Sequence, residues 1–215
     1  MRKTLFSGIA ACLLATAATA AEQSPSVIWT VGQADRSASE FALAPDRFRD
    51  FLANDFGYED KYFLVGHSVP AADFPYVLPG PADTWGGTWP TSGWRTHQVN
   101  ILFGLKEIPS DGTCTLVVDL LDYAKNFLPL VKVSVNTQDA KFQLDAPGLC
   151  VADQRKPNQM EKIVDTLSIT GNLAKATPRR LEIPIRPGVL KAGGNEVTIT
   201  VLEGSWILFD RVSLE

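Results

Sequence analysis

Short runs of alternating apolar and polar residues are the feature of this sequence that most constrains its fold. In residues 96–105, THQVNILFGL, the side chains of Val99, Ile101 and Phe103 share one face of an extended chain, because successive side chains of a strand point to opposite faces. Glycine, proline, asparagine and aspartate separate about ten such runs, which cover residues 26–32, 62–68, 96–105, 114–124, 130–136, 141–146, 163–170, 179–187, 195–204 and 205–215. This pattern predicts an all-β fold, an antiparallel β-sandwich with jelly-roll connections.

Two stretches depart from the strand pattern. Residues 44–55, APDRFRDFLAND, place Pro45 and Asp46 before an apolar face that contains Phe48 and Phe51, which predicts one short helix. Residues 68–95 are so rich in proline and glycine that we expect a long loop without regular structure. A long loop inside a compact domain is usually functional or disordered, and the aromatic residues of this loop favour an ordered one.

The N-terminus is typical of a bacterial Sec-type signal peptide. Arg2 and Lys3 precede an apolar run over residues 5–18, and residues 18–20 form an A-x-A cleavage signal. The run is too short for a membrane anchor, which needs about 20 apolar residues, and a lipoprotein box at Cys12 is the remaining alternative. We therefore expect residues 1–20 to be removed, residues 21–215 to form a single domain, and the protein to be periplasmic or secreted.

The net charge and the absence of several motifs exclude some classes of partner and of catalytic site, and the cysteines suggest a disulfide. The chain has a net charge of −4 and lacks a basic run, so it is a poor candidate for binding nucleic acid or an anionic membrane. Cys114 and Cys150 remain after cleavage, and in an exported chain they are expected to form a disulfide, the alternative being two separate thiols. The sequence lacks the ligand spacing of a zinc site, the G-x-S-x-G elbow of hydrolases and nucleotide-binding fingerprints.

The stretch DTWGGTWPTSGWRTHQ, residues 83–98, holds the best candidates for a ligand site. Glycine and proline prevent a regular helix here, so the tryptophan rings are presented from irregular backbone. Flat aromatic rings pack against the apolar face of a sugar, while nearby polar groups bond its hydroxyls. The candidate ligand-binding residues are Asp83, Trp85, Trp89, Trp94, Arg95 and His97. The alternative is that these tryptophans cap the core of the sandwich, and we expect part of the set to do so.

A polysaccharide lyase is the enzymatic alternative. β-Elimination across a uronic acid needs a base that removes a proton and a cation that neutralises the carboxylate. Arg95 is the candidate for the cation, since its guanidinium can hold a carboxylate through two hydrogen bonds. The candidate bases are Tyr58, Lys61, Tyr62, His67 and His97.

Acidic residues leave further alternatives open. Two of Asp55, Glu59 and Asp60 would hydrolyse a glycoside if they stood about 5–10 Å apart across a cleft, although a solvated face before a strand is the favoured interpretation. Asp35 and Arg36 form either a plain turn, which is favoured, or a contact with a cation or a sugar. A structural calcium ion is compatible with these residues, but no regular D-x-D-x-D loop supports it, and we expect no cofactor.

Several blocks together resemble a known family. They are WTVG (29–32) with the following Asp35-Arg36-Ser37 and Glu40-Phe41, the block FGYEDKYFLVGHS…DFPYVLPGP…TWGGTWPTSGWRTHQVNILFGL (56–105) and the closing WILFDRVSLE (206–215). They are similar to the C-terminal β-sandwich module of rhamnogalacturonan lyases of polysaccharide lyase family four, and to related modules of bacterial polysaccharide lyases. The resemblance covers residues 27–215.

The resemblance implies a galactose-binding-like jelly roll with a carbohydrate-binding role. In those lyases the elimination belongs to a separate N-terminal domain, so no catalytic residue is carried over to this chain. We therefore expect an exported module that binds a plant or microbial polysaccharide containing uronic acid or rhamnose. The alternatives are an active polysaccharide lyase, and a non-catalytic module that docks to a partner enzyme of a polysaccharide degradation system.

Overall fold

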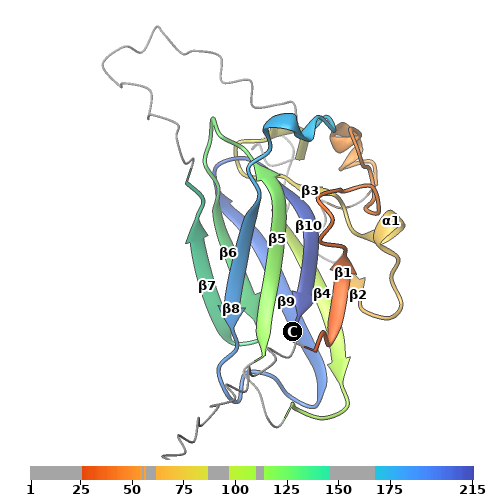
Figure 1. The fold of residues 1–215 in the computed structure, drawn as a ribbon, viewed down its shortest axis with the longest axis vertical. Helices are drawn as coiled ribbons and strands as arrows, with labels where there is room; N and C mark the ends of the chain where they lie inside the picture. Colours follow the sequence, from red (N-terminus) through yellow and green to blue (C-terminus); the bar gives the residue numbers. More distant parts are fainter. Residues whose placement is uncertain (1–25, 55, 57–61, 87–96, 110–113, 146–167) are drawn as a thin grey trace, which may run out of the picture.

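The computed structural model describes residues 26–54, 56, 62–86, 97–109, 114–145 and 168–215, and they form two sheets packed face to face (Figure 1). The first, called the β10 sheet, contains β1 (Trp29–Gly32), β3 (Val77–Leu78), β5 (Thr115–Tyr123), β8 (Arg179–Pro184) and β10 (Ile207–Leu214). Its order is β1–β10–β5–β8, with β3 also paired to β10. The second, called the β9 sheet, has the order β2–β4–β9–β6–β7. Its strands are β2 (Tyr62–Leu64), β4 (Gln98–Leu105), β6 (Leu130–Val135), β7 (Gln138–Gln143) and β9 (Gly193–Glu203).

The core lies between the two sheets, where the alternating pattern places the apolar residues. Val131, Val133 and Val135 of β6 are fully buried, and the residues between them are partly exposed. β5 is buried along nearly its whole length, in agreement with its continuous apolar run. Burying one such aliphatic side chain contributes about 1.5–3 kcal/mol. The predicted all-β sandwich is confirmed.

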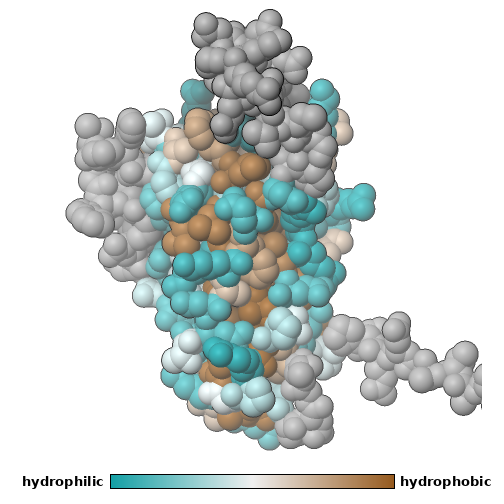
Figure 2. Space-filling view, turned by 90° about the vertical axis from the view of Figure 1, so that its left-hand side faces the viewer, coloured by the Kyte–Doolittle hydropathy of each residue, from teal (hydrophilic) through white to brown (hydrophobic). Residues whose placement is uncertain are grey.

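Apolar residues also reach the surface at one edge of the sandwich. Seen from the side on which β7 lies in Figure 1, hydrophobic residues form a band along the long axis, bordered on both sides by hydrophilic residues (Figure 2). β7 and β8 are the last strands of their sheets in the order of pairing. Such a band is expected where the space between two packed sheets opens at their edge strands.

One pair of strands differs from the antiparallel arrangement expected from the sequence. β2 pairs with β4 in parallel, with Tyr62 opposite Asn100 and Leu64 opposite Leu102, whereas the other pairs between the strands named above are antiparallel. The chain between β2 and β4 crosses to the β10 sheet, where it contributes β3, and then returns. A parallel pair requires such a crossover, so the expectation was wrong for this pair.

The short helical segments are not where the sequence predicted them. Residues 44–54 form turns around a single 3₁₀ turn, η1 (Phe48–Asp50), instead of one longer helix. Phe51 is fully buried here, so the tertiary contacts of this segment override its helical pattern. The stretch expected to lack regular structure contains α1 (Pro70–Asp73), β3 and η2 (Thr84–Gly86). Residues 168–170 form a turn before η4 (Leu173–Lys175), and the remainder of the strand expected at 163–170 lies outside the described residues.

The predicted disulfide is not found. Cys114 is a free thiol, 8% exposed, in the hydrophobic core, and Cys150 lies outside the described residues. Burial raises the pKa of the Cys114 thiol, and its carbonyl accepts a hydrogen bond from the Ile185 backbone at 2.8 Å. Cys114 therefore packs as a small apolar residue. Within the described ranges, no helix is long and apolar enough to cross a membrane.

Candidate functional site

Trp85 lies in η2 and is half-buried against an aromatic cluster. Its ring meets Phe48 edge-on, with centroids 5.0 Å apart and an interplanar angle of 78°. Phe51 meets the same ring at 6.0 Å and 81°. Edge-to-face pairs of this kind contribute about 0.5–1.5 kcal/mol beyond the burial of their area. Trp85 is therefore anchored to the core on one side while part of its surface remains accessible.

Asp83 holds the loop that carries Trp85. Its side chain is 8% exposed, and its carboxylate accepts hydrogen bonds from the Gly80 backbone at 2.8 Å and from the Ser205 hydroxyl at 2.6 Å. The Ala82 backbone donates to the Gly204 carbonyl at 2.9 Å. These bonds attach the η2 loop to the turn between β9 and β10. The sequence predicted a contact between Asp83 and a ligand, which stays a prediction, whereas the contacts described here fix the loop.

Close backbone approach makes this attachment rigid. A side chain on Gly80 would place its Cβ 2.5 Å from the Gly204 carbonyl oxygen, and one on Gly204, whose φ is +81°, would place it 2.3 Å from the Leu128 carbonyl oxygen. Such contacts cannot form without moving the backbone. The β9–β10 turn is thus packed between the η2 loop and the β5–β6 connection.

Phe127 in the β5–β6 connection is a further aromatic residue at this end of the sandwich. Its carbonyl accepts a hydrogen bond from the Ser205 backbone at 2.9 Å, and its side chain is 63% exposed. The sequence reasoning missed it, although an aromatic residue inside the turn segment KNFLP (125–129) was a visible signal. Phe48 was also missed as a contact of Trp85.

His97 reaches the same end of the sandwich through the start of β4. Its carbonyl accepts a hydrogen bond from the Val201 backbone at 2.9 Å, two residues before the end of β9. The ring is half-buried, and burial lowers the pKa of His97 below its usual value, which favours the neutral imidazole. Its Nδ1 is buried and has no hydrogen-bond partner among the described residues, which costs stability unless a further group satisfies it.

These residues define one end of the sandwich, uppermost in Figure 1, called the tryptophan end: Asp83, Trp85, His97, Phe127 and Ser205. Trp89, Trp94 and Arg95 lie outside the described residues, as does Lys61. The structure thus places Asp83, Trp85 and His97 at one end of the sandwich, and their contact with a ligand stays a prediction.

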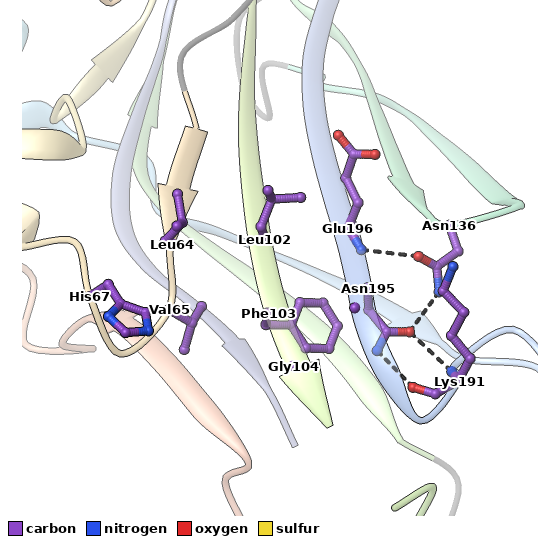
Figure 3. Close-up of a pocket in the computed structure, with 11 residues that line it drawn as sticks. Leu64, Val65, His67, Leu102, Phe103, Gly104, Asn136, Lys191, Asn195 and Glu196 are labelled. Carbon is purple, nitrogen blue, oxygen red and sulfur yellow. Dashed lines mark hydrogen bonds between the residues drawn. The ribbon is translucent and has the colours of Figure 1, made fainter. Parts of the chain in front are cut away.

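His67 is at the opposite end of the β9 sheet. It follows β2, which runs parallel to β4 and pairs Leu64 with Leu102, so it lies near the end of β4 that is remote from His97. Its exposed ring lines a groove with Leu102, Gly104 and Glu196 (Figure 3). β4 has eight residues, which correspond to about 26 Å of extended chain. The two candidate histidine bases are therefore far apart.

Asp35 and Arg36 form a turn beside the end of β1. The Arg36 backbone, at φ +65°, donates to an Asp210 carboxylate oxygen at 3.1 Å, and Asp35 accepts from the Ser37 backbone at 2.9 Å. Burial of Asp210 raises its pKa to about 6, with further increases from Asp35, Asp119 and Glu40. Within the described ranges, no three histidine, cysteine or acidic side chains form a group that could hold a metal ion.

Comparison with known proteins assigns the family of this fold. The family described as "CBM-like: Polysaccharide lyase family 4, domain III" matches residues 27–214. Among solved structures, a family GH115 4-O-methyl-α-glucuronidase with specificity for decorated arabinogalactans matches at 12% identity, with a TM-score of 0.29. That match covers 58% of this chain and 14% of the glucuronidase, and no curated protein matches the chain. The family match spans nearly the whole described structure, and the chain therefore belongs to the CBM-like domain III family of polysaccharide lyase family 4.

Proposed function

We propose that the protein is an exported carbohydrate-binding module that holds a uronic-acid- or rhamnose-containing polysaccharide at its tryptophan end. The observation that carries the proposal is the way Trp85 is held. Phe48 and Phe51 fix its orientation, and the η2 loop is attached to the β9–β10 turn by Asp83. A ring fixed in this way loses little conformational freedom when a sugar packs on it.

The neighbouring residues supply the polar and aromatic contacts that a sugar needs. Burial favours the neutral form of the half-buried His97 ring, and the accessible part of a neutral imidazole can exchange a hydrogen bond with a hydroxyl group. In this proposal Trp89 and Trp94 add stacking surfaces, and Arg95 pairs with a uronate carboxylate. In this proposal the leader over residues 1–20 directs the module to the periplasm or beyond.

Titration of the mature protein with rhamnogalacturonan and with polygalacturonate tests the proposal. Tryptophan fluorescence should change in a saturable manner, and no unsaturated product should absorb in the far ultraviolet. Trp89→Ala should weaken binding at least tenfold, whereas Trp29→Phe, a change in the core, should not weaken it. Formation of an unsaturated product that Arg95→Ala abolishes would identify a lyase instead. If neither polysaccharide alters the fluorescence and the protein co-purifies with an enzyme, it is a docking module.

A further inference from the structure

The β9 sheet carries a groove at the end remote from Trp85, and this end of the sheet is called the groove end. The groove has a volume of about 480 Å³. Figure 3 shows Leu64 and Leu102 on neighbouring strands, His67 on one side of them, and Glu196 and Lys191 on the other. β9 continues for seven residues beyond Glu196, to Glu203, so about 23 Å of extended chain separates the groove from the β9–β10 turn. The groove is therefore a separate site from the tryptophan end.

Glycines open the floor of this groove. Gly104 of β4 lies opposite Gly194 of β9. A Cβ on Gly194 would meet nothing within 4 Å, and one on Gly104 would meet only the Gly193 carbonyl oxygen at 4.0 Å. Neither position has the positive φ that requires glycine, so their lack of side chains leaves the face hollow. Leu64, which is 42% exposed, adds apolar surface beside them.

Hydrogen bonds inside the wall keep the groove in shape. The Asn136 side-chain NH₂ donates to the Val189 carbonyl and to the Asn195 side-chain oxygen, each at 2.8 Å. The Asn136 side-chain oxygen accepts from the Glu196 backbone N–H at 3.0 Å. The Asn195 amide donates to the Lys191 carbonyl at 2.8 Å. These contacts fix the β8–β9 connection against the β6–β7 turn, so the groove is preformed.

Three charged or polar side chains line the groove without partners of their own. Within the described ranges, the side chains of Glu196, Lys191 and His67 make no ion pair or hydrogen bond of their own. One carboxylate and one ammonium group balance each other in charge, which favours an uncharged ligand over an ionic one. A carboxylate can accept hydrogen bonds from two adjacent hydroxyl groups, and an ammonium group donates to hydroxyl or ring oxygens.

We propose that the groove is a second carbohydrate site, which binds an uncharged sugar unit with its C–H face on Leu64, Leu102 and the two glycines. The mixture of an apolar floor and a few fixed polar groups is typical of ligand sites. The ligand class rests on the proposed function, whereas the location does not. One polysaccharide that engages both ends would bind more tightly than either site alone allows.

The test uses the mature protein and a neutral probe, β-1,4-linked galactotetraose. In amide-resolved NMR titration, the backbone signals of Gly104, Gly194 and Glu196 should shift in a saturable manner. Gly194→Leu fills the groove without a clash at Cβ and should weaken binding at least tenfold, and Glu196→Gln should weaken it several-fold. Glu182→Gln, an exposed change on β8 of the other sheet, should have no effect.

The outcomes separate this inference from the proposed function. If the three amides do not shift, or if a folded Gly194→Leu protein binds the tetrasaccharide as well as wild type, the groove is not a carbohydrate site. That result leaves acidic-polysaccharide binding at the tryptophan end intact, which fluorescence reports. Conversely, groove shifts without any fluorescence response to rhamnogalacturonan or polygalacturonate would support the groove and overturn the function proposed for the tryptophan end.

Discussion

The two ends of the β9 sheet are built by different means. At the tryptophan end, loops that are distant in sequence are held together by a buried carboxylate, close backbone contacts and aromatic packing. At the groove end, the regular strands β2, β4 and β9 form the surface, and two opposed glycines hollow it. The first surface therefore depends on tertiary packing of loops, whereas the floor of the second depends on the register of its strands.

Glycine-to-alanine substitutions should show the largest difference between the ends. Gly204→Ala places a Cβ 2.3 Å from the Leu128 carbonyl oxygen at a φ of +81°, and we expect it to lower the free energy of unfolding by about 3 kcal/mol. Gly104→Ala meets no close atom and should change it by less than about 0.5 kcal/mol. Urea unfolding monitored by circular dichroism checks both values. Equal effects at the two positions would contradict the comparison.

Asp83→Ala should be the next largest change and should act on both stability and binding. It removes the acceptor of the Gly80 backbone and of Ser205, and leaving buried donors unpaired costs about 1–3 kcal/mol. Because the η2 loop is then released, binding of acidic polysaccharide should weaken together with stability.

Asp83→Asn is the matched variant, because its amide oxygen can still accept one of these hydrogen bonds. It should lose less stability than Asp83→Ala in thermal unfolding. An Asp83→Ala protein that unfolds like wild type but no longer binds polysaccharide would instead assign Asp83 a direct contact with the sugar.

Asp210, which lies on β10 of the other sheet, should give the protein a pH-dependent stability. Its folded-state pKa is raised to about 6, so the folded protein binds the proton more tightly than the unfolded chain. This contribution to stability is present below about pH 4, the usual pKa of an aspartate, and is lost as the pH rises through 6. Asp210→Asn keeps an acceptor for the Arg36 backbone and should stabilise the protein at pH 8 by about 1–2 kcal/mol.

Thermal unfolding at several pH values between 4 and 8 checks the Asp210 prediction. Asp210→Ala serves as the control, because it removes the charge but also leaves the Arg36 backbone N–H without its acceptor. It should therefore be less stable than Asp210→Asn at pH 8. An unchanged pH profile in Asp210→Asn would show that another group causes the dependence.

The sequence predicted the parts of the molecule that depend on local periodicity. The alternation over 130–136 and 195–204 gave β6 and β9 nearly at their observed bounds, because one face of each strand is buried. The alternation did not predict β3, because a strand of two residues is too short to show a period. It also did not predict that β2 pairs in parallel with β4, because a crossover of the chain decides that pairing.

The candidate site was predictable only in part, for the same physical reason. Tryptophans in a glycine-rich loop indicated the tryptophan end, but the burial of Asp83 depends on Ser205, which is distant in the chain. The groove was invisible in the sequence, because Gly104 and Gly194 meet only through the register of β4 and β9. Contacts between distant residues therefore account for what the sequence pattern did not give.

His97 should give the smallest effect, and its sign distinguishes it from Asp210. Burial lowers its folded-state pKa, so the unfolded chain binds the proton more tightly. The neutral ring therefore contributes stability above the unfolded-state pKa, about 6.5, and this contribution is lost as the pH falls through the lower folded-state pKa. Because the ring is only half-buried, we expect its contribution to the free energy of unfolding to change by less than about 1 kcal/mol between pH 7 and 5.

NMR titration of the His97 ring gives the pKa directly, and His97→Gln should remove the corresponding slope from the plot of unfolding free energy against pH. If bound polysaccharide donates a hydrogen bond to the neutral ring, ligand should lower this pKa further. A pKa that rises on binding would show instead that the sugar's carboxylate pairs with the protonated ring.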